Sequence, residues 1–214
     1  MLFGIVLVYG STGSLYLDAI AIAAGTTPMP KLFYAGVTLL LVGLSFKVAA
    51  VPFHFWAPDV YQGAPTHITA LMAILVKTAA FAAFFRLFAV CFSSFHQWEN
   101  IVAAFIVLSL IVGNITAVFQ SSTKRMLAYS GISHTGFMLM SLLFINPAAG
   151  STGQAAVIYY ALAYSVASIT AFTVLNLVID KNGSDSFDSF NGLAKNNPAL
   201  AFVMAVAMLS MAGI

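Results

Sequence analysis

Residues 68–88, ITALMAILVKTAAFAAFFRLF, decide the fold of this protein. The stretch is apolar over about the 20 residues that a bilayer-spanning α-helix requires. Lys77 lies in its middle, roughly 15 Å from either end at ~1.5 Å per residue. We therefore predict a spanning helix over residues 67–92 that carries an ionisable side chain near the centre of the bilayer.

The composition supports a membrane protein. Of the 214 residues, 61% are hydrophobic and 7% are charged, whereas an ordinary soluble domain is about one quarter charged. The net charge of +2 comes without a basic run, which argues against nucleic acid as a partner. Cys91 is the single cysteine, so an internal disulfide and a cysteine metal cluster are excluded.

The apolar runs predict a single transmembrane domain over residues 1–214. Only closed barrels and helices satisfy the backbone in lipid, and these runs are too long for barrel strands of about ten residues. We expect an all-α, polytopic bundle that is a piece of a longer protein, with partial spans at 1–10 and 198–214. The five full spans are expected near 32–51, 67–92, 101–119, 126–145 and 154–179.

The links between spans give an orientation. Counting spans places the links at 58–65, 120–124 and 180–197 on one side of the membrane. That side carries more basic residues, namely Lys124, Arg125, Lys181 and Lys195, against Lys31 and Arg86 on the other side. Basic loops favour the cytoplasm, so we predict that these three links are cytoplasmic.

Three ionisable residues inside predicted spans are candidates for function: Lys47, Lys77 and His134. A lysine near the bilayer centre costs roughly 2.5–3.5 kcal/mol, and such residues usually serve function in a wet interior. Lys47 could instead snorkel to an interface, which is harder for the more central Lys77. Arg86 lies near a helix end and is interpreted as a snorkelling anchor. The pattern favours a proton relay.

His134 is accompanied by a polar strip of Tyr129, Ser130 and Ser133. Histidine titrates near neutral pH and can both donate and accept a proton. The alternative is a hydrogen bond between helices with no role in transfer. Three ionisable groups in one bundle favour the relay.

The span that contains Lys47 is expected to break at Pro52. Proline removes a backbone donor and clashes with the preceding turn, and Pro58, Gly63 and Pro65 follow. Broken helices line conducting sites in transporters, and His54 lies just beyond this break. The alternative is an ordinary interfacial loop with an aromatic belt, formed by Phe53, Phe55 and Trp56.

Carboxylates are missing from the predicted spans. Asp59 lies in a link and Glu99 at a helix start. A charge that moves near a buried lysine changes whether the amine holds a proton. If a carboxylate controls these lysines, it lies in another part of the protein or in another chain.

Residues 46–66, FKVAAVPFHFWAPDVYQGAPT, closely resemble the signature of the subunit N family of bacterial NADH–quinone oxidoreductase, or respiratory complex I. The mitochondrial counterpart of that family is NADH dehydrogenase subunit 2. Residues 75–88, 120–139 (QSSTKRMLAYSGISHTGFML) and 208–214 are also similar to the family.

The resemblance implies an antiporter-like fold of inverted repeats, with residue roles. Lys47 would be the lysine of the broken seventh helix, Lys77 that of the eighth, and His134 the histidine of the tenth. The family's fifth-helix glutamate and twelfth-helix lysine have no counterpart here.

The resemblance also implies a function: a proton-translocating subunit of a translocase enzyme in the bacterial inner membrane. Its partners would be other membrane subunits, including related antiporter-like ones, and the lipid bilayer. This chain would hold no redox centre, because NAD, FMN, iron–sulfur clusters and quinone would bind elsewhere in the complex. The alternatives are a subunit of a related cation/proton antiporter and a non-transporting helical membrane scaffold.

Overall fold

The computed structural model describes the chain except residues 27, 93, 95, 144–151 and 214. The described residues form helices and turns, with one isolated antiparallel bridge between Ser122 and Ser186 and no strand among them. The elements in chain order are α1 (Leu2–Thr12), α2 (Leu17–Thr26), α3 (Lys31–Lys47), α4 (Trp56–Gly63), α5 (Thr66–Leu71), η1 (Met72–Val76), α6 (Lys77–Phe85), η2 (Arg86–Cys91), α7 (Gln97–Val118), α8 (Thr123–Leu143), α9 (Thr152–Asn182), η4 (Phe187–Phe190), α10 (Leu193–Asn196) and α11 (Pro198–Ala212).

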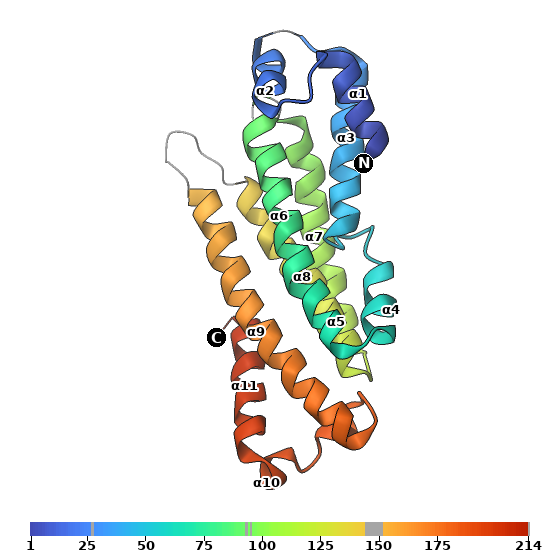
Figure 1. The fold of residues 1–214 in the computed structure, drawn as a ribbon, viewed down its shortest axis with the longest axis vertical. Coiled ribbons are helices and arrows are strands. Elements are labelled where there is room, and N and C mark those ends of the chain that lie inside the picture. The colour runs from blue at the N-terminus through green and yellow to red at the C-terminus, as the bar shows by residue number, and fades with distance from the viewer. Residues whose placement is uncertain (27, 93, 95, 144–151, 214) are drawn as a thin grey trace.

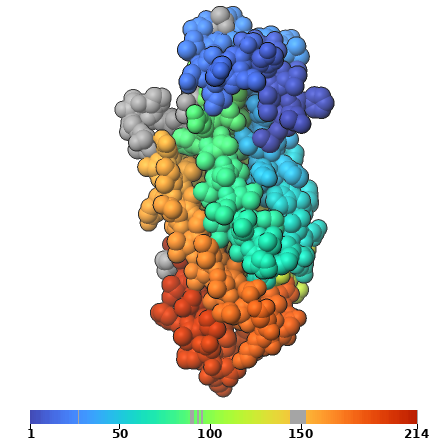
Figure 2. Space-filling model, viewed as in Figure 1, coloured from blue at the N-terminus to red at the C-terminus, as the bar shows by residue number. Residues whose placement is uncertain are grey.

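Four helical segments in the described part of the chain are long and apolar enough to cross a membrane: Thr66–Phe88, Gln97–Val118, Thr123–Leu143 and Gly153–Asn182. The pair α1 and α2, bent by 59°, would be a fifth. The helices extend along the long axis of an elongated molecule (Figure 1), with α1 and α2 at one end and α10 at the other (Figure 2). The predicted all-α, polytopic membrane bundle is confirmed.

The chain breaks between α3 and α4, as expected near Pro52. Residues 48–55 form turns, and Ala49 has a positive φ of 58°, a conformation that L-residues rarely adopt. Side chains of neighbouring helices bind the freed backbone groups. The Val51 N–H donates to Ser109 Oγ on α7 at 3.0 Å, and Thr135 Oγ1 on α8 lies 2.9 Å from the Val48 carbonyl. The irregular segment is therefore held inside protein, which is what a bilayer requires.

Several bounds differ from the predicted spans. α3 ends at Lys47 instead of 51, because the chain turns before it reaches Pro52. α4 is a helix within a stretch that we expected to be an irregular link, and α2 is a helix where none was predicted. Residues 144 and 145, at the end of the fourth predicted span, lie outside the described residues. The division into five full and two partial spans remains a prediction.

Close packing of α7 on α8 positions the polar strip of α8. Gly113 allows this approach, because a methyl group there would lie 2.8 Å from the Ser133 nitrogen. α8 is the most enclosed of the four long spans, with 61% of its spanning window buried. Its ionisable and hydroxyl side chains therefore face protein on most sides.

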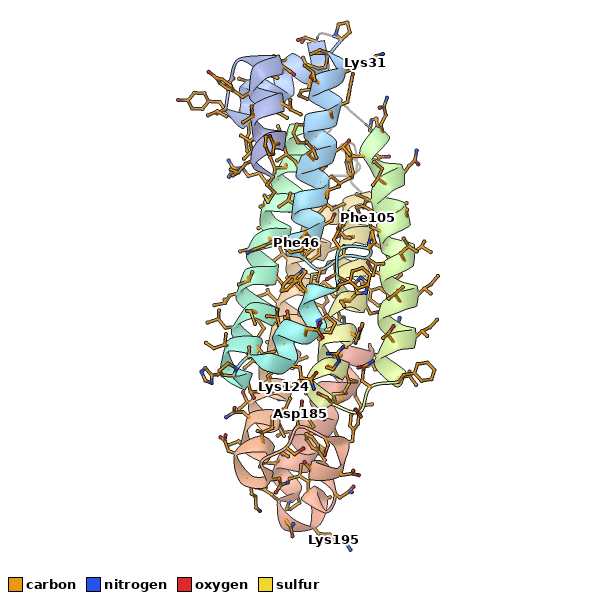
Figure 3. All side chains as sticks on the ribbon, turned by 90° about the vertical axis from the view of Figure 1, so that its right-hand side faces the viewer. Lys31, Phe46, Phe105, Lys124, Asp185 and Lys195 are labelled. Carbon is orange, nitrogen blue, oxygen red and sulfur yellow. The ribbon has the colours of Figure 1, made fainter. Side chains whose placement is uncertain are left out.

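The links at 58–65, 120–124 and 180–197 meet at one end of the molecule. The Thr123 N–H donates to the Asp185 carbonyl at 2.8 Å, and Ser122 Oγ donates to the Asp185 carboxylate at 2.5 Å. Lys124 Nζ donates to the Ala64 carbonyl at 3.1 Å. Figure 3 shows Lys124 and Asp185 toward the end opposite Lys31. The three links thus form one connected cap on the bundle.

Candidate functional site

Lys77 is the most enclosed of the predicted site lysines. Its side chain projects from the start of α6 and is 5% exposed. The ammonium nitrogen donates to the Gly131 carbonyl of α8 at 2.5 Å and lies 5.4 Å from the centre of the Tyr164 ring on α9. A cation over an aromatic face is attracted by the ring quadrupole. Three helices distant in sequence therefore hold this charge.

Two π-helical turns flank the helix that carries Lys77. η1 (Met72–Val76) comes immediately before the lysine, and η2 (Arg86–Cys91) follows Phe85. A π-turn inserts an extra residue and rotates the side chains that follow, and such turns are frequent at functional sites. Here η1 sets the direction in which the side chain of Lys77 leaves the helix.

The close approach of Lys77 to Gly131 leaves little room for a side chain at position 131. A methyl group at Gly131 would lie 3.2 Å from Lys77 Nζ and 3.1 Å from Tyr164 Oη. Both distances are tighter than ordinary packing, so a larger side chain would displace the amine or the phenol. The sequence analysis did not identify Gly131 or Tyr164.

His134 continues the polar interior one turn along α8. It is 7% exposed, and its Nδ1 lies 2.7 Å from Tyr160 Oη. Its ring centre lies 4.8 Å from that of Tyr164, which also faces Lys77. Tyr164 thus contacts both ionisable groups, and Tyr160 extends the hydrogen-bonded series beyond the histidine.

Thr135 connects Lys77 to the helix break. Its hydroxyl oxygen lies 2.9 Å from the Val48 carbonyl and 3.1 Å from the Gly131 carbonyl. One hydroxyl hydrogen can serve only one of these acceptors at a time. The Val48 carbonyl, next to Lys47, and the Gly131 carbonyl, which accepts from Lys77, therefore compete for the Thr135 hydroxyl.

Lys47 differs from the expectation of a buried group. It is the last residue of α3 and is exposed on the described chain. It nevertheless shares a cavity of about 160 Å³ with Lys77, lined also by Trp56 and Tyr61. A cavity of that size has room for several water molecules. Of the two lysines that line it, Lys47 is exposed and Lys77 is buried.

The secondary site residues take separate positions around the break. Pro52 lies within the turns, and His54 beyond it is 6% exposed with its ring 6.5 Å from that of Tyr129. His54 Nδ1 and Ser133 Oγ are buried and have no hydrogen-bond partner among the described residues. Tyr129 is therefore adjacent to the break, whereas neither His54 nor Ser133 is hydrogen-bonded to Lys77 or His134.

A second cavity lies on the far side of His134. It has a volume of about 80 Å³ and is lined by His134, Tyr160 and Tyr164 together with residues of the last helix, Ser210 among them. One cavity is thus shared by Lys47 and Lys77, and a separate one lies between His134 and α11.

Carboxylates do not neutralise these interior cations in the described part of the chain. The ion pairs found there are His96–Glu99 and Arg125–Asp59, both at helix ends. Within the described ranges, no group of three or more histidine, cysteine, aspartate and glutamate side chains could hold a metal ion. The interior offers an amine, an imidazole and phenols, which can exchange protons, and carbonyls, which accept hydrogen bonds.

This all-helical membrane bundle, broken beside one lysine and enclosing a second, has the architecture of an antiporter-like membrane protein. The sequence model of the family described as "NADH:quinone oxidoreductase/Mrp antiporter, TM" matches residues 1–214, and the chain belongs to this family.

Curated relatives carry the expected name. The chain is 44% identical to NADH-quinone oxidoreductase subunit N of Flavobacterium psychrophilum and 41% identical to that of Desulforamulus reducens, over 100% of its own length. It covers 46% and 44% of those proteins, so it spans less than half the length of the relatives it matches. The predicted resemblance to subunit N is confirmed.

Solved structures agree on the fold. A chain of respiratory complex I from Thermus thermophilus matches with 40% identity and a TM-score of 0.79. A chain of the Mrp complex from Dietzia matches with 26% identity and a TM-score of 0.87. Each match covers 100% of this chain, and 44% and 39% of the respective structures' chains.

Proposed function

We propose that this chain forms the conducting part of a proton-translocating membrane subunit of NADH–quinone oxidoreductase, with Lys47, Lys77 and His134 as the relay. One observation carries the proposal. Lys47 and Lys77 line one cavity, and Tyr164 links Lys77 to His134. Ionisable groups placed close together in a membrane interior are a costly arrangement that usually serves transport.

The surroundings of Lys77 suit a switchable charge. Its contacts are a neutral carbonyl and a neutral ring, so no carboxylate among the described residues holds the proton on the amine. A charge that moves nearby then decides whether Lys77 is protonated. In the proposed mechanism, charge shifts elsewhere in the complex reach Lys47 first, and protons pass to Lys77 and on to His134.

His134 would pass the proton toward α11. Its Nδ1 shares a hydrogen bond with Tyr160 Oη at 2.7 Å, and its ring has a second nitrogen that can also carry a proton. Uptake at one nitrogen and release at the other moves a proton without moving the side chain. The cavity beside Ser210 supports an exit in that direction.

A related cation/proton antiporter is the second candidate, because the matching family includes Mrp antiporters and the Dietzia Mrp chain has the higher TM-score. Sequence identity favours complex I, at 40% against 26%. Sodium transport without NADH would favour the antiporter. A non-transporting scaffold would instead require dry cavities around Lys77.

The further roles follow from the same proposal. The subunit would belong to a translocase in the bacterial inner membrane, with the linked ends at 58–65, 120–124 and 180–197 in the cytoplasm. Other membrane subunits of the complex would surround it. NAD, FMN, iron–sulfur clusters and quinone would bind in other parts of the complex.

The test compares proton pumping with electron transfer in the assembled complex. Lys77→Ala and Lys47→Ala, made in the full-length subunit, are expected to lower protons pumped per NADH oxidised by about tenfold or more, by analogy with removal of a proton-transfer group. Lys181→Ala is the matched control, because Lys181 is an exposed lysine at the end of α9. Normal pumping in Lys77→Ala with full electron transfer would overturn the relay.

A further inference from the structure

A second site lies on the outer face, away from the relay. A groove of about 490 Å³ runs between α6–η2 and α9, which form adjacent stripes on the face shown in Figure 2. Its walls are mainly apolar and include Ala82, Phe85 and Leu162. Its lining contains one cation, Arg86, and no acidic residue. The groove is therefore an apolar channel with a positive charge at one end.

Arg86 and Gln154 mark that end. Within the described residues, neither side chain forms a hydrogen bond or an ion pair. Both are exposed. Seven donor hydrogens, five on the guanidinium and two on the amide, are thus offered to a ligand. They would suit an anion with several acceptor oxygens, such as a phosphate.

The depth of the groove matches one leaflet of a bilayer. Arg86 follows the mid-membrane Lys77 by nine residues, or about 14 Å along a helix. Half of the hydrocarbon core is about 15 Å. Arg86 therefore lies at the level of lipid headgroups. From Gln154 to Ser165 on α9 the groove descends eleven residues, about 16 Å, which reaches the bilayer centre.

We propose that this groove binds an anionic phospholipid, with its phosphate on Arg86 and Gln154 and one acyl chain along Ala82 and Leu162. The site lies beyond the proposed proton relay and does not depend on it. A helix of a partner protein would fill the apolar part, but it would also have to place a carboxylate opposite Arg86 and Gln154. A free phosphate would leave the apolar channel unfilled. A lipid satisfies both ends.

The test is native mass spectrometry of the full-length subunit with phosphatidylglycerol and phosphatidylcholine of the same acyl chains. Phosphatidylglycerol is expected to be retained about tenfold more strongly, because both lipids carry the phosphate but the choline of phosphatidylcholine places a like charge beside Arg86. Arg86→Gln should remove this preference, and Arg86→Lys should keep part of it. The control Lys31→Gln removes an exposed cation from the same end of the bundle and should change nothing.

A second variant tests the apolar part separately. Ala82→Trp fills the channel without altering charge and should lower the retention of both lipids. Equal retention of the two lipids by the unmodified chain would overturn the proposal. So would equal losses in Arg86→Gln and Lys31→Gln, or unchanged retention in Ala82→Trp. None of these results would affect the pumping test at Lys77.

Discussion

The interior around Lys77 and the cap formed by the three links treat charge in opposite ways. In the cap, Arg125 Nη1 lies 2.5 Å from the Asp59 carboxylate, and Ser122 donates to Asp185. In the interior, Lys77 is bound by a carbonyl and an aromatic ring. At the cap, Arg125 is paired with an anion, although Lys124 donates to a backbone carbonyl. In the interior, Lys77 has no anionic partner among the described residues.

The difference indicates what each region is for. Paired charges at a solvated end cost little and hold the links against one another. Each pair contributes only about 0–1 kcal/mol to stability. An enclosed cation without a carboxylate costs stability, since burial disfavours charge. A sequence that keeps such a group gains something other than stability from it. Removing the interior cation should therefore raise the stability of the chain, whereas removing the paired cation of the cap should lower it.

The largest effect is expected for Lys77→Met. Methionine has a similar volume and needs no solvation, so the chain should become more stable by about 1–3 kcal/mol while the full-length subunit loses pumping. Stability is measured by heating the purified chain with a thiol-reactive fluorophore. Cys91 is the single cysteine and is buried, so its reaction reports unfolding.

Lys47→Met is the matched control, because Lys47 is exposed and lacks these contacts. It should leave the unfolding temperature unchanged. A less stable Lys77→Met chain would mean that the lysine is held for structure, and the contrast between interior and cap would fail.

Gly131→Ala should separate the effect of the position of the Lys77 amine on pumping from any effect on the stability of the chain. The added methyl group, 3.2 Å from Lys77 Nζ, displaces the amine from its acceptor. Pumping in the full-length subunit should fall about three- to tenfold, since small misplacements of reacting groups are costly. The unfolding temperature should change little, because alanine favours the helix.

The control for this variant lies five residues further along α8. Gly136→Ala would bring its methyl group 3.0 Å from Leu110 Cγ, on the side of α7. That crowding is similar but does not reach the lysine, so pumping should remain normal. Equal losses in both glycine variants would point to general disruption of α8.

Thr135→Val tests the link between the helix break and the interior. Valine keeps the shape but removes the donor to the Val48 carbonyl, which should cost about 1 kcal/mol and lower the unfolding temperature by roughly 2–4 °C for a chain of this size. Thr173→Val is the control, because Thr173 donates within its own helix to the Ile169 carbonyl. Similar shifts in both variants would remove Thr135 from the interior network.

The parts of the fold that could be predicted have local signals. The apolar run around Lys77 has the length of a bilayer, and Pro52 cannot continue a helix. Asp59 and Glu99 were expected outside the spans, and the structure pairs them with Arg125 and His96. Length, proline chemistry and the cost of buried charge were sufficient for these predictions.

The site residues that could not be predicted from the sequence depend on contacts between helices that are distant along the chain. Gly131 meets Lys77 across 54 positions of sequence, and a glycine in a helix gives no sign of which side chain it admits. Tyr160 and Tyr164 lie in an apolar run in which aromatic residues are common. The exposed position of Lys47 follows from where α3 ends, and helix ends are the least certain feature of a sequence pattern.

The smallest effect is expected in the cap. Arg125→Gln removes the ion pair with Asp59, whose side chain is 74% exposed, so water solvates the freed carboxylate. Stability should fall by no more than about 1 kcal/mol, and added salt should shrink the difference because surface pairs are screened. Heating Arg125→Gln and the unmodified chain at low and high salt measures both quantities.

The gain in stability of Lys77→Met, in contrast, should persist at high salt, because the lysine is enclosed by protein. If the cap variant lost more stability than about 1 kcal/mol and kept that loss at high salt, the cap would share the interior's dependence on enclosed charge, and the division between the two regions would be wrong.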